Sequence, residues 1–321
     1  MVKNYNSIDV IKFVMALIVV AIHTHPENGI ENHLFLRMIK SIYSIAVPFF
    51  FVASGFFLYN KLKQLEHTSQ LLYLLGWIYR IARLYIIWTI VYLPYAIWGF
   101  SKDGMAFSKC IVVYLRNVFF VGENYLSWPL WYLLAMIVVG TIIYFLIKCE
   151  IKLYVMAFIA LLLALVGIWI DSLHELGVGD IYYKLFKHTR NGLFIGLPFM
   201  MIGMLVSNYG CLKKKSLLFL LLFLGFLAKM NNFVIGDYIT IYAFFQLVLT
   251  INLKDSESYL SFSLASMVIY LVHMIWVGLI FILFPKLSSL LLFLLTILLS
   301  ILTSCFVLRY KHNNAIKLMF K

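Results

Sequence analysis

Apolar runs long enough to cross a lipid bilayer recur along the whole of this 321-residue sequence. A crossing helix needs roughly 20 apolar residues, and none of these runs alternates apolar with polar residues as barrel strands do. The sequence therefore predicts an all-α polytopic membrane bundle of about ten transmembrane helices. We expect them near Ile8–His23, Ile42–Tyr59, Leu84–Phe100, Ser127–Ile147, Leu153–Ile170, Leu193–Ser207, Ser216–Ala228, Gly236–Asn252, Leu260–Phe284 and Ser288–Leu308.

The composition excludes an ordinary soluble domain. Hydrophobic residues make up 64% of the chain and charged residues 12%, against about 45–50% and about 25% in soluble proteins. A soluble core could not bury this apolar surface without leaving large patches in water. The net charge of +13 is explained by basic cytoplasmic loops and anionic lipid head groups. Membrane lipid is therefore an expected partner, and nucleic acid is not.

The placement of charges sets the expected orientation. With the N-terminus in the cytoplasm, the cytoplasmic segments carry more of the lysines and arginines, and most acidic residues fall outside. Both termini are then cytoplasmic. We expect one membrane-embedded domain over residues 1–321 with no appended soluble domain. The four cysteines lack the spacing of a metal site, so no metal is expected, and no pattern fixes an oligomeric state.

Three ionisable residues share one face of the first helix. Lys12 and His23 are eleven positions apart, about 20° past three full turns, and Asp9 falls on the same side. Asp9 can pair with Lys12 and offset part of its burial cost. Because Pro26 is expected to end the helix, His25 is expected at the interface and His23 is preferred. The alternative for His23 is an end-of-helix histidine bonded to a loop.

Arg80 and Arg83 form a second cluster, which we place at the cytoplasmic end of the third helix. Three positions apart, both guanidiniums can face one spot and bind phosphate groups bidentately. Ordinary anchoring by snorkelling arginines is the alternative.

Further candidates lie in three aromatic segments. Ser54 precedes Gly55 in a phenylalanine-rich helix, where the small step permits close approach of a helix or ligand. Trp131 lies at the outer interface, where an aromatic belt is the alternative. His273 follows Tyr270 by three residues in a late helix and is either a core histidine or part of the polar face.

These segments, in this order, resemble the acyltransferase family 3 of integral membrane proteins. The resemblance rests on Ile8–His23, Phe49–Phe56, Arg80–Arg83, Trp128–Tyr132 and Tyr270–His273. The family's first helix has an arginine, ten residues and then a histidine. This sequence has Lys12 in place of that arginine, which keeps the charge without the planar fork. The segment Thr189–Phe194, with Arg190 and Asn191, is similar to the membrane domain of vancomycin-resistance serine racemases, here without their racemase domain.

The resemblance implies transfer of an acyl group, usually acetyl, from cytoplasmic acyl-CoA to an extracytoplasmic or membrane-linked acceptor such as a cell-surface glycan. It implies a location in the bacterial cytoplasmic membrane. Arg80 and Arg83 would bind the polyanionic donor, and His23 would act as general base or transient acyl carrier, supported by Asp9 and Lys12.

Two other functions stay open at this point. The first is a transporter-like module for a small molecule such as serine, which Thr189–Phe194 and Lys12 favour. The second is a purely structural membrane scaffold.

Overall fold

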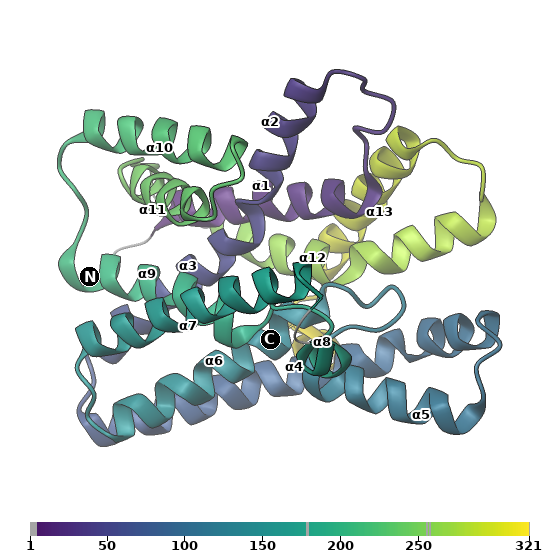
Figure 1. Ribbon diagram of the computed structural model, residues 1–321, viewed down its shortest axis with the longest axis horizontal. Helices are drawn as coiled ribbons and strands as arrows, with labels where there is room; N and C mark the ends of the chain where they lie inside the picture. The colour runs from purple at the N-terminus through teal and green to yellow at the C-terminus, as the bar shows by residue number, and fades with distance from the viewer. Residues whose placement is uncertain (1–4, 178–179, 255, 257, 321) are drawn as a thin grey trace. The chain divides into compact units, whose positions relative to one another are not determined.

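The protein is an all-helical membrane bundle (Figure 1). The computed structural model describes residues 5–177, 180–254, 256 and 258–320, and these residues contain no strand. Within them, 8 helical segments are long and apolar enough to cross a membrane, which confirms the predicted fold class. They are Asn6–Thr24, His33–Leu62, His67–Lys102, Leu130–Lys148, Leu153–Glu175, Gly192–Tyr209, Tyr259–Leu283 and Ser289–Arg309. The predicted cytoplasmic ends, Met1 and Lys321, lie outside the described residues.

The helices group into two compact units. The first unit comprises Met1–Phe57 and Val206–Phe320, and the second comprises Leu58–Leu205. The chain changes from one unit to the other inside α3 (Ala46–Leu62) and again inside α9 (Leu197–Tyr209). The expectation of one domain over residues 1–321 stays a prediction.

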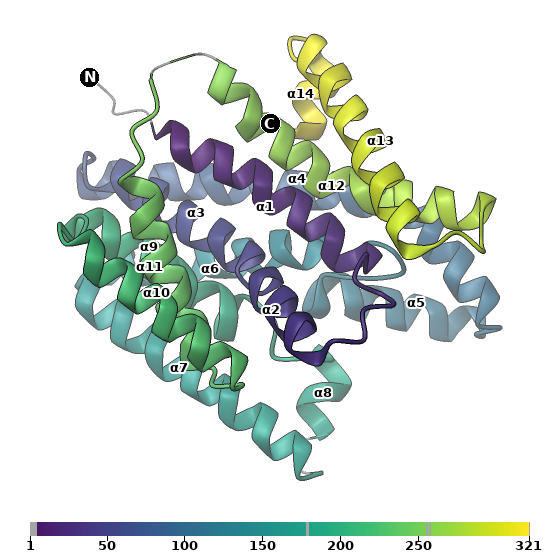
Figure 2. The same ribbon diagram turned by 90° about the horizontal axis from the view of Figure 1, so that it is seen from above.

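In the first unit, α1 (Asn6–Thr24) packs against α12 (Ser258–Leu283) and α13 (Ser289–Arg309) (Figure 2). The helices α1 and α12 run parallel, because three contacts follow in the same order along α1 and along the chain that leads into and through α12. These contacts join Asn6 to Lys254, Phe13 to Phe262, and His23 to His273. The small side chain of Ala16, fully buried beside Val20 and Ile269, lets the two helices approach closely.

The hairpin of α10 (Lys215–Met230) and α11 (Ile235–Leu249) belongs to the same unit. A Cβ atom at Gly225 would lie 2.6 Å from the Thr240 hydroxyl oxygen, so only glycine permits this approach. With 16 and 15 residues, each helix is roughly 24 Å long, less than the roughly 30 Å hydrocarbon core. The predicted total of about ten crossings includes both helices and stays a prediction. The unit also contains the short helices α2 (His33–Tyr43) and α14 (Asn314–Phe320).

In the second unit, α4 (His67–Lys102) and α6 (Leu130–Lys148) form an antiparallel pair. His67 Nε2 lies 3.0 Å from the carbonyl oxygen of Ile147, and Gly140 makes room for the Trp77 ring farther along. The π-helix η2 (Gly192–Gly196) packs against α6 and against α7 (Leu153–Glu175). Three short helices complete the unit: α5 (Phe107–Arg116), η1 (Asn117–Val121) and α8 (Asp180–Phe186).

The first boundary of α4 differs from the sequence prediction. We predicted a helix opening near Leu84, with Arg80 and Arg83 at its start, but the helix begins at His67 and spans 36 residues. Hydropathy locates the lipid-crossing part of a helix, whereas the earlier turns stay helical because they pack on the protein; Leu74, for example, is fully buried. Arg80 is therefore roughly 20 Å from the start of the helix, and the prediction that the pair opens it was wrong.

Candidate functional site

The predicted ion pair of the first helix is present. The Lys12 ammonium lies 3.5 Å from the Asp9 carboxylate, and the two side chains are 19% and 15% exposed. The same ammonium lies 4.7 Å from the centre of the Phe57 ring, on α3. An aromatic face and a carboxylate both stabilise a desolvated cation, so these two contacts offset part of the cost of placing Lys12 among helices.

His23, in the last turn of α1, lies beside His273 of α12. The ring centroids are 5.3 Å apart and the planes differ by 25°. This contact joins two helices that are far apart in sequence, and it places His273 on the predicted polar face.

His273 is a buried histidine with a defined tautomer. Its side chain is 0% exposed, and its Nδ1 lies 3.0 Å from the carbonyl oxygen of Ile269. A carbonyl can only accept, so Nδ1 carries the proton and neutral Nε2 keeps a lone pair. This Nε2 is enclosed and has no hydrogen-bond partner among the described residues. His273 is thus only half satisfied, unlike an ordinary core histidine.

The aromatic candidates of the first unit lie around this pair. The Tyr270 ring is buried, with its centroid 6.3 Å from that of His273 and 5.7 Å from that of Phe50. Ser54 is half-buried on α3, four residues beyond Phe50. Tyr270 thus lies beside the histidine pair and Phe50 beside Tyr270, and a hydrophobic surrounding strengthens electrostatic interactions within it.

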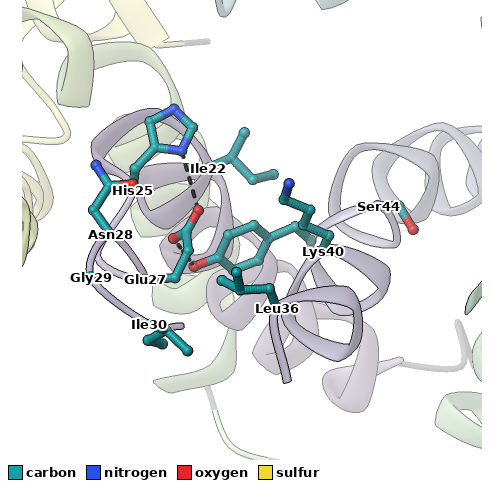
Figure 3. Close-up of a pocket in the computed structure, with 10 residues that line it drawn as sticks. Ile22, His25, Glu27, Asn28, Gly29, Ile30, Leu36, Lys40 and Ser44 are labelled. Carbon is teal, nitrogen blue, oxygen red and sulfur yellow. Dashed lines mark hydrogen bonds and ion pairs between the residues drawn. The ribbon is translucent and has the colours of Figure 1, made fainter. Parts of the chain in front are cut away.

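A second constellation at the end of α1 was not selected from the sequence. His25 Nδ1 lies 3.2 Å from Glu27 Oε1, and the Tyr43 hydroxyl donates to Glu27 Oε2 at 3.0 Å (Figure 3). Burial alone would raise the pKa of the Glu27 carboxyl, but a backbone hydrogen bond and those from His25 and Tyr43 outweigh it. That pKa therefore lies below its usual range, and Glu27 is ionised at neutral pH.

Figure 3 shows the pocket that these residues line. Its volume is about 510 Å³. The wall combines the end of α1, the loop after it, α2 and the residue that follows α2, and includes Ile22, His25, Glu27, Lys40, Tyr43 and Ser44. The sequence signal for this site was a histidine followed two residues later by a carboxylate, just past the end of a membrane helix.

In the second unit, Arg80 is exposed on α4 and Arg83 is half-buried one turn later. The Nε atom of Arg83 is enclosed and makes no hydrogen bond to any residue that the structure describes. A guanidinium with an unused donor suits an anionic ligand, whereas simple snorkelling would carry the charged head into water.

Glu123 forms ion pairs with Arg190 and His188, and Arg190 also contacts Trp131. Arg190 donates to its carboxylate at 2.9 Å and lies 5.0 Å from the centre of the buried Trp131 ring, while His188 Nε2 is 3.4 Å from the second carboxylate oxygen. Burial alone would raise the pKa of the Glu123 carboxyl, but the hydrogen bond from His188 and the charge of Arg190 lower it by more. The pKa therefore lies below its usual range. The structure thus brings Arg190 and Trp131 together. We call the ion-paired group of Glu123, His188 and Arg190 the Glu123 clamp.

Asn191 has a structural role. Its side-chain oxygen accepts from the backbone N–H groups of Leu193 and Phe194, at 2.9 and 3.1 Å, and so caps η2. Its amide donates to the Tyr182 hydroxyl at 2.7 Å. These bonds satisfy donors and acceptors that a short helix would otherwise leave unpaired.

The sequence-predicted residues therefore fall into two sets. The first unit holds Asp9, Lys12, His23, Ser54, Tyr270 and His273, and the second unit holds Arg80, Arg83, Trp131, Arg190 and Asn191. Of the first set, His23 and His273 are in contact, and Asp9 contacts Lys12.

Comparison with known proteins agrees with this architecture. Three relatives are racemases of Enterococcus: an amino-acid racemase of Enterococcus faecalis, 30% identical over 64% of this chain; a serine/alanine racemase of Enterococcus gallinarum, 26% identical over 77%; and a second amino-acid racemase of Enterococcus faecalis, 26% identical over 84%. The aligned regions cover 28–37% of the length of these relatives. No solved structure gives a significant match. The model of the acyltransferase domain family matches residues 5–310. The chain therefore belongs to this acyltransferase family and is a multi-pass integral membrane protein.

Proposed function

We propose that this chain transfers an acyl group, in the simplest case acetyl, from cytoplasmic acyl-CoA to a hydroxyl group on the outer side of a bacterial cytoplasmic membrane. A cell-surface glycan is the acceptor that best suits this orientation. The observation that carries the proposal is His23 beside the buried, half-satisfied His273, in a chain whose family match extends over residues 5–310. The Enterococcus relatives support a bacterial membrane.

The proposed reaction exchanges one thioester for one ester. An oxygen of the acceptor hydroxyl forms a bond to the acyl carbon, the bond from that carbon to the CoA sulfur breaks, and the sulfur leaves as thiolate. The hydroxyl proton passes to a base and then to solvent, and the thiolate takes up a proton. The products are one ester and one molecule of free CoA. If the acyl group first rests on His23, the imidazole nitrogen takes the place of the sulfur in the second step.

Each residue has a distinct part in this proposal. Arg80 and Arg83 bind the phosphates of the donor, because two guanidiniums three residues apart on α4 can address one polyanion. Lys12, paired with Asp9, lies on the α1 face that leads to His23 and holds the inner end of that face in place. His23 acts on the acyl group as base or carrier.

The first test measures release of free CoA from labelled acetyl-CoA by the full chain in lipid nanodiscs. His23→Ala should reduce acyl transfer and CoA release by roughly 100-fold or more. His33→Ala is the matched control, since His33 is exposed on α2 in the same unit and should retain the wild-type rate. Equal rates for wild type and His23→Ala would show that His23 has no part in the reaction.

A second test concerns the donor site. The double variant Arg80→Ala with Arg83→Ala should weaken CoA binding, which isothermal titration of nanodisc-embedded protein measures directly. Arg37→Ala, an exposed arginine of α2, controls for lost positive charge. Undiminished CoA affinity in the double variant would leave the pair as membrane anchors.

The names of the relatives favour one alternative function, a module that binds or transports a small amino acid. Uptake of labelled serine into proteoliposomes without any acyl-CoA would support it. Acyl-CoA-dependent chemistry without uptake would exclude it as the main function.

A further inference from the structure

We propose that His25, held by Glu27, is the general base that activates the acceptor hydroxyl, and that the pocket beside it takes a hydroxyl compound carrying an anionic group. The inference rests on the proposed function and deepens it. It assigns the acceptor step to His25, which leaves His23 for the acyl group.

The geometry defines which nitrogen of His25 is the base. An ionised carboxylate can only accept, so the 3.2 Å contact with Glu27 Oε1 places the proton on Nδ1. Nε2 then keeps its lone pair on the ring edge that faces away from the carboxylate (Figure 3). A carboxylate that orients a histidine and stabilises its protonated form is the arrangement used by hydrolase triads.

Glu27 is buried and His25 is exposed, as is needed for a fixed carboxylate that orients an accessible base. Glu27 is 8% exposed and is also held by the Tyr43 hydroxyl, whereas the side chain of His25 is 60% exposed. The carboxylate is therefore fixed within the protein, and the imidazole is accessible to a substrate at the rim of the pocket.

The backbone at His25 sets the direction of its side chain. His25 ends α1 with φ 50° and ψ 55°, the left-handed conformation in which glycine is the least costly residue. Its N–H still donates to the Ala21 carbonyl at 2.9 Å, so the cap itself needs only the backbone. This conformation ends the helix and turns the imidazole toward Glu27.

The charges that line the pocket indicate the acceptor class. Lys40 projects into the same space from α2 (Figure 3), and its ammonium has no carboxylate partner within the described part of the chain. Glu27 is already engaged by two donors. An incoming anion would therefore bind Lys40, and its hydroxyl group could then reach His25 at the opposite wall.

The chemical step is a simple acyl transfer. His25 Nε2 takes the hydroxyl proton while the acceptor oxygen bonds to the acyl carbon and the leaving atom, CoA sulfur or His23 nitrogen, departs with its electron pair. The imidazolium, stabilised by Glu27, then returns its proton to solvent, and the leaving group is protonated.

The test uses full-length protein in nanodiscs with acetyl-CoA, and sn-glycerol 3-phosphate or glycerol as the acceptor probe. Free CoA is measured with and without the probe. For wild type we expect faster release with sn-glycerol 3-phosphate than with glycerol. His25→Gly should lower the probe-dependent rate by roughly 100-fold or more and lower the rate without probe far less. Its melting temperature should not fall, because glycine suits φ 50°.

His33→Ala is again the matched control and should behave as wild type. Lys40→Gln should raise the KM for sn-glycerol 3-phosphate with a much smaller change in kcat. An undiminished probe-dependent rate in His25→Gly, repeated in His25→Asn, would overturn the role of His25. Equal or no stimulation of wild type by the two probes would overturn the acceptor class. Absence of any CoA release by wild type would instead overturn the proposed function, and this inference with it.

Discussion

Each unit of the molecule contains a largely buried glutamate that holds a histidine, and the two arrangements differ in what surrounds them. Glu27 is 3.2 Å from His25, and Glu123 is 3.4 Å from His188. In the second unit Arg190 also binds the carboxylate at 2.9 Å and covers the Trp131 ring. In the first unit the third partner is a neutral hydroxyl, from Tyr43.

The two histidines also differ in the ring nitrogen that does not contact the glutamate. His188 uses Nε2 for its glutamate, and its Nδ1 is enclosed without a partner among the described residues. His25 uses Nδ1, and its ring is 60% exposed against 26% for His188. A glutamate neutralised by an arginine holds loops together, whereas one that holds an accessible histidine prepares it for proton transfer. On the proposal made for His25, the same pair of residue types serves structure in one unit and chemistry in the other.

The largest expected effect separates the two glutamates by activity. Glu27→Gln should lower acceptor-dependent transfer by roughly 100-fold to 10,000-fold, because an amide can donate to Nδ1 and so select the wrong tautomer. Glu123→Gln should change the same rate by less than about threefold, since its histidine takes no part in proton transfer. Rates of CoA release with sn-glycerol 3-phosphate provide the comparison. Similar losses in both variants would abolish the distinction between the units.

For stability we expect the larger effect in the second unit and the smaller one in the first. Arg190→Gln leaves the 12%-exposed Glu123 side chain without its guanidinium, and we expect the free energy of unfolding to fall by about 1–3 kcal/mol. Lys40→Gln should cost less than about 0.5 kcal/mol, because Lys40 is exposed. Chemical unfolding in mild detergent measures both. A larger fall in the free energy of unfolding for Lys40→Gln than for Arg190→Gln would mean that the pocket lined by Lys40, and not the Glu123 clamp, stabilises the fold.

The smallest effect is the pH dependence of these two carboxylates. Both have a folded pKa below the usual value, so each contributes stability that is fully present above the unfolded glutamate pKa of about 4.3. That contribution is lost as the pH falls through the lowered folded pKa. The stability difference between wild type and Glu27→Gln or Glu123→Gln should therefore shrink below about pH 4.3. A difference that stays constant down to pH 3 would show that neither carboxylate is stabilised in its charged form.

Much of the fold was predictable because lipid restricts the possible structures so strongly. Apolar length alone identifies crossing helices, and helical periodicity alone placed Asp9 beside Lys12 on the face that ends at His23. The first boundary of α4 was not predictable in this way, since its turns before Leu84 are stabilised by packing on the protein. The contact of His23 with His273 joins residues 250 positions apart, which no local pattern reveals.

The case of His25 shows why a helical projection has limits. A continuing helix would turn His25 away from the face that bears His23, so the sequence favoured His23 alone. The chain instead leaves the helix at His25 in a left-handed cap, which turns its imidazole toward Glu27. The direction of a side chain beyond the last helical turn depends on the cap, and helical periodicity no longer applies there.

The parallel course of α1 and α12 restricts how the chain can be threaded through the bilayer. Two crossing helices that point the same way must be separated by an odd number of other crossings. Between them lie five segments long enough to cross, together with the shorter α10 and α11. Five and seven are both odd and six is not, so α10 and α11 either both traverse the membrane or both turn back within it. In either case α11 ends on the side of the membrane on which α10 begins.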